Sequence, residues 1–148
     1  MIKVQGLNKT IQDKAILQNI NVEINKGKLT TMIGPNGAGK STLLSAITRL
    51  IDFESGTIEI EGKLIRDYKS NELAKKLAIL KQSNHTELNI TVEELVKFGR
   101  FPHSKGRLKQ EDRDQVEYAL DLLQLNEIRD RYLKTLSGGQ RQRAYVAM

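Results

Sequence analysis

The stretch GPNGAGKS, from Gly34 to Ser41, decides the fold of this chain. It fits the pattern G-x-x-x-x-G-K-[ST], and it lies between an apolar, β-branched run, LTTMI (29–33), and a segment with helical periodicity. Its glycines allow a tight turn in which successive N–H groups face inward and can bind phosphate oxygens at the start of a helix. The pattern therefore predicts a P-loop nucleotide site between a strand and a helix.

Strand and helix patterns alternate around this loop, up to about Gln82. Alternating or β-branched apolar runs predict strands at 2–4, 20–24, 29–33, 57–61 and 77–81. After Ser41 the spacing becomes helical, and Gly56 closes that segment. The apolar residues on this helical face are Leu43, Leu44, Ile47, Leu50 and Ile51. This order of elements predicts an α/β layer.

Beyond Gln82 the pattern is mainly helical. Thr91 and Glu94 have capping-box spacing for a helix that Gly99 ends. A longer helix is marked by Val116, Ala119, Leu120 and Leu123. We therefore expect a helical section after the α/β layer.

Composition limits the classes of function. The chain has 148 residues, 39% of them hydrophobic and 28% charged, which is typical of one globular domain. The absence of cysteine excludes disulfides, thiolate metal sites and cysteine nucleophiles. The net charge of +6 suits a partner that bears phosphates, although a generally basic surface would give the same balance. No apolar run is long enough to span a bilayer, and the first residues lack a secretory signal, so we expect a cytosolic protein.

A second anion-binding pattern, LSGGQRQR, lies at 136–143. Ser137 can cap a helix whose free N–H groups face a phosphate, and Gly138 and Gly139 permit close approach of the backbone. Together, GPNGAGKST and LSGGQRQR resemble the nucleotide-binding domain of the ATP-binding-cassette (ABC) family. In that family two domains pair head to tail, and the LSGGQ segment of one covers ATP held by the P-loop of the other. The resemblance thus implies a homodimer in which the two sites serve different nucleotides.

The resemblance also assigns residues to ATP and Mg²⁺. Lys40 and Gln82 are the implied catalytic residues, and Ser41 and Gln82 are implied to approach the metal ion. Ile11 aligns with the place where family members carry an aromatic residue on adenine, so an aliphatic contact with the base is expected. The implied nucleotide contacts are Gly34, Pro35, Asn36, Gly37, Ala38, Gly39, Lys40, Ser41 and Thr42, with Ser137, Gly138, Gly139 and Gln140 supplied in trans.

The implied architecture is an α/β P-loop NTPase domain with an antiparallel β subdomain and a helical subdomain. Residues 1–82 would form the nucleotide-binding part, and residues 83–148 the helical subdomain with LSGGQ. The family's Walker B Asp-Glu and switch histidine come after LSGGQ, so we expect this chain to be a fragment truncated before the Walker B strand. Such a fragment should bind nucleotide without appreciable turnover and should self-associate through unpaired sheet edges.

Two further segments resemble one subfamily in particular, the ATPase subunits of bacterial iron–siderophore importers. These segments are TVEELVKFGRFPH (91–103) and EDRDQVEYALDLL (111–123). In these proteins the region corresponding to Gln82–His103 faces the membrane-spanning permease, which makes Arg100 and Phe101 candidate contacts. Their simpler interpretation is a loop cation and a core aromatic residue. The implied location is the cytoplasmic face of the cell membrane, with no direct contact to nucleic acid.

Two other functions remain open at this point. One is a soluble ABC-class ATPase that acts on nucleic acid or the ribosome, which the positive charge permits. The other is a nucleotide-binding module without turnover. His85 and His103 precede LSGGQ, whereas the family's switch histidine follows it, so both are predicted to be surface residues.

Overall fold

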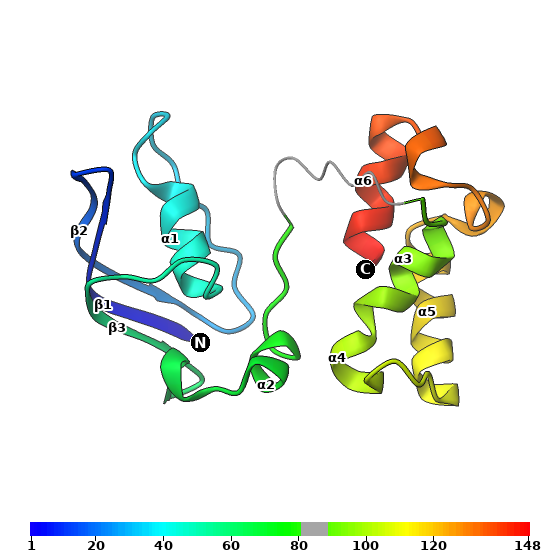
Figure 1. Cartoon of the computed structure of the whole chain (residues 1–148), viewed down its shortest axis with the longest axis horizontal. Coiled ribbons are helices and arrows are strands. Elements are labelled where there is room, and N and C mark those ends of the chain that lie inside the picture. Colours follow the sequence, from blue (N-terminus) through cyan, green and yellow to red (C-terminus); the bar gives the residue numbers. More distant parts are fainter. Residues whose placement is uncertain (81–88) are drawn as a thin grey trace. The chain divides into compact units, whose positions relative to one another are not determined.

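The computed structural model describes residues 1–80 and 89–148, which form two compact units. The sheet unit is Met1–Ala78, and the helical unit is Ile79–Met148. Figure 1 shows the elements of both, and each unit is described by itself. In the described ranges, no helix is both long and apolar enough to cross a membrane.

The sheet unit is built on a four-stranded antiparallel sheet with the order β2-β1-β3-β4. The strands are β1 (Ile2–Ile11), β2 (Lys14–Ile24), β3 (Ser55–Ile60) and β4 (Lys63–Leu64). The strands β1 and β2 form a hairpin whose turn residues, Gln12 and Asp13, have φ of 48° and 60°. A two-residue turn with both residues in the left-handed region matches the twist of the adjoining strands. The hairpin places Ile11 beside this turn, opposite Lys14.

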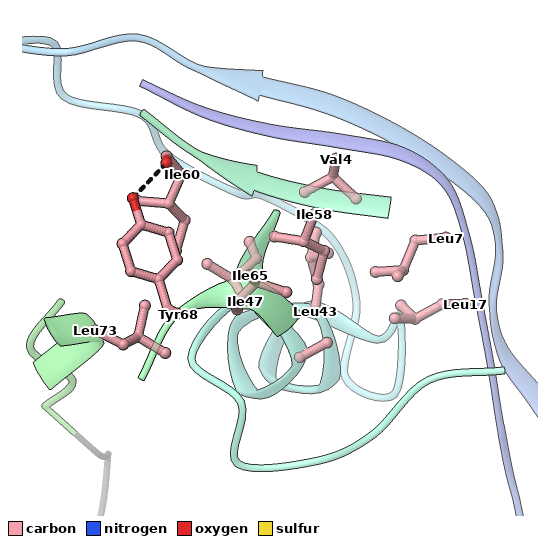
Figure 2. Packing of buried hydrophobic residues seen from close by; sticks show 11 residues of the cluster. Val4, Leu7, Leu17, Leu43, Ile47, Ile58, Ile60, Ile65, Tyr68 and Leu73 are labelled. Atoms are coloured by element: carbon pink, nitrogen blue, oxygen red, sulfur yellow. Dashed lines mark hydrogen bonds between the residues drawn. The ribbon is translucent and has the colours of Figure 1, made fainter. Parts of the chain in front are cut away.

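One face of the sheet packs against α1 (Lys40–Ile47). Figure 2 shows Val4 and Leu7 of the sheet lying toward Leu43 and Ile47 of the helix. The chain continues through the 3₁₀ turn η1 (Ile65–Asp67) and α2 (Ser70–Ala74). The hydroxyl of Tyr68 donates to the Ile60 carbonyl at 2.8 Å, which satisfies the one polar atom of this buried ring.

The helical unit contains α3 (Val92–Gly99), α4 (Phe101–Ser104), α5 (Gln110–Leu122) and α6 (Gly138–Ala147). Short 3₁₀ turns lie at η2 (Asn126–Ile128) and η3 (Leu133–Thr135). Helix α3 packs against both α5 and α6. The core consists of Val92, Leu95, Val96, Val116, Leu120, Leu125, Leu133, Leu136, Ala144 and Tyr145.

Most of the elements expected from the sequence are confirmed. Strands occur at 2–4, 20–24 and 57–60, and the longer helix occurs as α5. Thr91 caps α3 through a complete capping box with Glu94, and the helix ends at Gly99. Local sequence patterns are sufficient to predict these elements, because the residues that pair with or cap each element lie in the same unit.

Two strand predictions are wrong. Residues 29–33 and 77–80 form no strand, and Leu29 and Ile33 are 96% and 93% exposed. An apolar, β-branched run shows that a segment is suited to a buried strand, but a strand forms only where neighbours pair with its backbone. None of the described strands pairs with either segment. Lys81, the last residue of the second run, lies outside the described residues.

The helix after the P-loop is also shorter than predicted. It ends at Ile47, and Arg49 adopts a left-handed φ of 56°. Leu43 and Ile47 are buried as expected, whereas Leu44 and Leu50 are exposed. Because Arg49 interrupts the helix, Leu50 and Ile51 lie in the loop after α1.

Candidate nucleotide-binding site

The P-loop is positioned by Gly39, which precedes the first residue of α1. Gly39 has a φ of 85°, a left-handed conformation that side chains disfavour. A Cβ at this position would lie 2.9 Å from the Leu17 Cδ2 atom and 3.0 Å from the Ile16 carbonyl oxygen. Glycine is therefore required here for two reasons, the backbone conformation and the close approach of β2.

The loop offers backbone donors to an anion. Ala38 N–H donates to the Pro35 carbonyl at 3.2 Å and closes the turn. The N–H groups of Gly37, Gly39, Lys40 and Ser41 have no acceptor in the described part of the chain. Free N–H groups at a helix start carry partial positive charge and bind phosphate oxygens. The geometry therefore fits a nucleotide phosphate.

The Lys40 side chain binds two carbonyl groups of the P-loop. Its ammonium donates to the Gly34 carbonyl at 2.7 Å and to the Pro35 carbonyl at 2.8 Å. An ammonium has three donors, so one remains for a phosphate oxygen while the loop stays closed. The side chain that the sequence assigned to the outer phosphates thus also holds the loop together, a role that sequence reasoning missed.

The other predicted contacts have different surroundings. Ser41 is exposed as the second residue of α1, as a metal-binding hydroxyl must be, and Thr42 is half-buried. Ile11 is 42% exposed. Gln82 lies outside the described residues. Within the described ranges, no group of three or more His, Cys, Asp or Glu side chains could hold a metal ion.

Ile16 is a neighbour of the P-loop that sequence reasoning missed. Its carbonyl oxygen and its Cγ2 atom lie 3.0 Å and 3.3 Å from the place that a Gly39 Cβ would occupy. The strand pattern of β2 contained no signal for this contact, because the pattern says which face is apolar and not which loop crosses it.

The LSGGQ segment forms the start of α6 in the helical unit. Ser137 Oγ accepts from Gln140 N–H at 3.3 Å, and Gln140 Oε1 accepts from Ser137 N–H at 3.1 Å. This reciprocal arrangement is the predicted cap in its complete form. Apart from the chain neighbours and the backbone of α6 itself, no heavy atom of the described residues lies within 4 Å of a Cβ built at Gly138 or Gly139. The helix start is therefore open to a ligand.

The candidate contacts Arg100 and Phe101 differ in their environment. Arg100 donates to Asp112 Oδ1 from Nε at 3.1 Å and from Nη2 at 2.9 Å. Lys109 N–H donates to the other oxygen of Asp112 at 3.1 Å. That amide, and then the guanidinium, lower the pKa of the buried Asp112 carboxyl. Arg100 thus ties α3 and α4 to the start of α5, an ion pair that the sequence did not reveal.

Phe101 is not a core residue. It is 55% exposed, and its ring stacks on Phe98 with centroids 6.1 Å apart. The simpler interpretation, a core aromatic residue, is therefore wrong, because the four-residue helix α4 leaves the ring outside the main cluster. His103 is exposed, which confirms that prediction, whereas His85 lies outside the described residues.

A second ion-pair group braces the same unit. Arg129 donates to both carboxylate oxygens of Glu117, at 3.0 Å and 2.7 Å, and to Glu93 at 3.2 Å. Glu117 first and Glu93 second raise the pKa of Arg129. The guanidinium therefore links α3 and α5 and remains charged.

Comparison with known proteins identifies the family of this chain. The family model described as ABC transporter matches residues 17–148. The chain belongs to the ABC transporter family. This confirms the predicted fold class, an α/β domain of the ABC type with an antiparallel sheet and helices.

Individual relatives agree with the family. The chain is 51% identical over its full length to the petrobactin import ATP-binding protein YclP of Bacillus subtilis (strain 168), and it covers 59% of that protein. It is 44% identical over 92% of its length to the iron(3+)-hydroxamate import ATP-binding protein FhuC of the same organism, and it covers 51% of that protein. The resemblance to iron–siderophore importer subunits is thus confirmed.

A solved structure is similar along almost the whole chain. The cbiO1 protein of Clostridium perfringens, part of the ABC transporter complex cbiONQ, superposes with a TM-score of 0.81 at 30% identity. The match covers 99% of this chain and 59% of that one. The chain therefore spans between about half and three fifths of the length of the proteins it matches.

Proposed function

We propose that this chain is the nucleotide-binding part of the ATPase subunit of a bacterial importer whose cargo is an iron–siderophore complex. The observation that carries the proposal is the P-loop, in which four N–H groups have no acceptor among the described residues and Lys40 has one donor beyond its two carbonyl contacts. Its similarity to ATP-binding proteins that import petrobactin and iron(3+)-hydroxamate supports the cargo class.

The residues of this chain would divide the binding of MgATP among them. The N–H groups without an acceptor in the P-loop would bind phosphate oxygens, and the third donor of Lys40 would reach the outer phosphates. These N–H groups belong to Gly37, Gly39, Lys40 and Ser41. The exposed Ser41 hydroxyl would hold Mg²⁺, which supplies neutralising charge when bound. Ile11 would contact the adenine, and Gln82 would orient the attacking water.

A second copy of the subunit would complete the site. The open start of α6, at Gly138 and Gly139, can approach a γ-phosphate closely, and Ser137 and Gln140 hold that helix start in shape. We therefore infer a head-to-tail homodimer in which each LSGGQ segment serves the partner's nucleotide. In the whole protein, ATP hydrolysis would drive transport.

The region Gln82–His103 would contact the membrane-spanning permease, at the cytoplasmic face of the cell membrane. The exposed, stacked pair Phe98 and Phe101 supports an interface in this region, because exposed aromatic residues are enriched at protein contacts. Arg100 would act by holding this surface in place through Asp112.

Stimulation of ATP hydrolysis tests the proposal against its alternatives. The whole protein would be assayed for phosphate release with its permease in vesicles, with ribosomes, and with DNA or RNA. We expect stimulation by the permease together with a loaded siderophore-binding protein, and none with Lys40→Ala. Stimulation by nucleic acid or ribosomes would instead support the soluble ATPase, and binding with no stimulated turnover would support the nucleotide-binding module.

A further inference from the structure

The turn inside the P-loop contains an asparagine that is followed by a glycine, Asn36-Gly37. This is the one Asn-Gly pair in the sequence. Ala38 N–H donates to the Pro35 carbonyl at 3.2 Å and closes the turn. Asn36 and Gly37 are therefore its two central residues, and both are exposed. Water and hydroxide ion can reach this pair.

The two groups of this pair that can react with each other are the Asn36 side-chain amide and the Gly37 backbone nitrogen. In the described part of the chain, Gly37 N–H has no acceptor and the Asn36 side chain makes no hydrogen bond. Gly37 has no side chain to shield its nitrogen, and a Cβ built there would meet no described atom within 4 Å apart from its chain neighbours. The nitrogen is therefore free to approach the amide.

Two other asparagines of the sheet unit lack these conditions. The side-chain amide of Asn21 is held at both ends, by hydrogen bonds of 2.9 Å and 2.8 Å, and a β-branched residue follows it in β2. Asn25 is exposed like Asn36, but it is followed by Lys26, whose side chain hinders approach to the backbone nitrogen. Of these three asparagines, Asn36 alone combines exposure, an unbound side chain and a following glycine.

We propose that Asn36 is a deamidation site inside the P-loop, and that bound nucleotide protects it. Hydroxide removes the proton of Gly37 N–H, and the nitrogen then attacks Cγ of Asn36. As the N–Cγ bond forms, the Cγ–Nδ2 bond breaks, and ammonia leaves after taking a proton from water. Water then opens the resulting succinimide ring at either of its carbonyl groups, which gives aspartate or isoaspartate. The reaction consumes water and releases ammonia, so it needs no oxidant or cofactor.

Isoaspartate at this position would alter the nucleotide site. Its backbone runs through Cβ and Cγ, so the loop gains one carbon atom before the Gly37 nitrogen, and the former main-chain carbonyl becomes a carboxylate. Gly37 N–H would be displaced from the phosphates, and the new negative charge would repel them. Conversely, a phosphate oxygen bound to Gly37 N–H would prevent this nitrogen from attacking. Both effects of nucleotide rest on the proposed function, whereas the chemistry of Asn36 does not.

Incubation at mildly alkaline pH tests this inference. Mass spectrometry of tryptic peptides would follow the exchange of amide nitrogen for oxygen at each asparagine, and protein-isoaspartate methyltransferase would label isoaspartate. Asn36 should convert before Asn21 or Asn25, and faster as the pH rises, because hydroxide generates the attacking nitrogen. MgATP at about 100 times its Kd should slow the conversion about 100-fold, since only the unbound fraction reacts. Circular dichroism would establish that the protein stays folded.

The matched control places the same dipeptide outside the P-loop. Lys26→Gly creates a second Asn-Gly pair at the exposed Asn25. Asn25 should then deamidate as well, but MgATP should not slow its conversion. Aged protein with isoaspartate at position 36 should bind MgATP at least about 10-fold more weakly than fresh protein, the equivalent of one lost hydrogen bond to a charged group.

Several results would overturn the inference. Asn36 that stays intact while Asn25 of the Lys26→Gly variant converts would show that the P-loop prevents the reaction. Equal conversion of Asn36 and Asn21 in folded protein would show that the turn has no special reactivity. Conversion of Asn36 that bound MgATP does not slow would remove the protection by nucleotide. If fresh protein failed to bind MgATP in calorimetry while Asn36 still converted first, the proposed function would be wrong and the deamidation site would stand.

Discussion

The chain starts two helices in anion-binding motifs, and the two starts are built differently. At α1 the preceding residue is a left-handed glycine, and within the described ranges no side chain caps the helix and the adjoining N–H groups have no acceptor. At α6 a serine and a glutamine cap each other's N–H groups. The N–H groups at the first start are therefore open to a ligand, whereas at the second the N–H group of Gln140 is already bound by the Ser137 hydroxyl.

This difference indicates how the two motifs divide their work. A helix start with free N–H groups and an adjacent ammonium can bind a triphosphate without help. A capped start offers chiefly its open glycines and its dipole, which contribute less by themselves. We therefore expect the affinity of this chain for nucleotide to depend on the P-loop and hardly at all on LSGGQ.

The largest expected effect is on the stability of the α1 start. Gly39→Ala should lower the free energy of unfolding by about 2–4 kcal/mol, because the left-handed backbone is strained by about 1–2 kcal/mol and the new Cβ would overlap β2. Urea unfolding measures the change. Gly37→Ala is the matched control. Gly37 has a similar φ of 82°, but a Cβ built there meets no described atom within 4 Å apart from its chain neighbours. Equal losses at both glycines would show that contact with β2 is unimportant.

The next largest effect is expected on the affinity for MgATP at the start of α1. Lys40→Ala should weaken MgATP binding by about 10-fold to 100-fold, since a hydrogen bond to a charged group contributes about 1.5–3 kcal/mol. Titration calorimetry measures the affinity, and urea unfolding separates it from any loss of the two carbonyl contacts. Lys28→Ala, an exposed lysine of the same unit, is the control. Unchanged affinity in Lys40→Ala would remove the P-loop assignment.

A smaller gain in affinity is expected at the base. Ile11→Tyr should tighten ATP binding by about 1–2 kcal/mol, because a ring can stack on adenine where an aliphatic side chain cannot. Ile11 is the last residue of β1 and 42% exposed, so a tyrosine can be accommodated without disturbing the core. Calorimetry with ATP, and with Ile11→Leu as the control, tests this. No gain, or a loss, would mean that the base lies elsewhere.

The sequence predicted those features of the two helix starts that depend only on residues close together in the chain. The P-loop pattern predicted a helix after the loop, and Ser137 was predicted to cap the helix that is α6. The two strands that were wrong, 29–33 and 77–80, depended on partners that no local pattern can supply.

Contacts between distant residues were missed for the same physical reason. The Arg100–Asp112 pair and the Arg129–Glu93 pair join residues 12 and 36 positions apart. The contact of Ile16 with Gly39 depends on where β2 crosses the loop. Such contacts follow from the tertiary fold, which propensity and periodicity do not encode. The roles assigned to Lys40, Ser41 and Ile11 in binding nucleotide stay predictions.

The smallest effect on nucleotide binding is expected at the capped start. Ser137→Ala should lower the free energy of unfolding of the chain by about 1 kcal/mol, the usual cost of losing a side-chain cap. It should leave MgATP affinity within about twofold, because the motif is proposed to serve a partner's nucleotide. Thr91→Ala removes the same kind of cap from α3 in the same unit, and so measures the cost of cap loss without a binding motif. If Ser137→Ala weakened MgATP binding tenfold at low protein concentration while Thr91→Ala did not, the capped start would be acting on the nucleotide of its own chain. The division of work between the two helix starts would then be wrong.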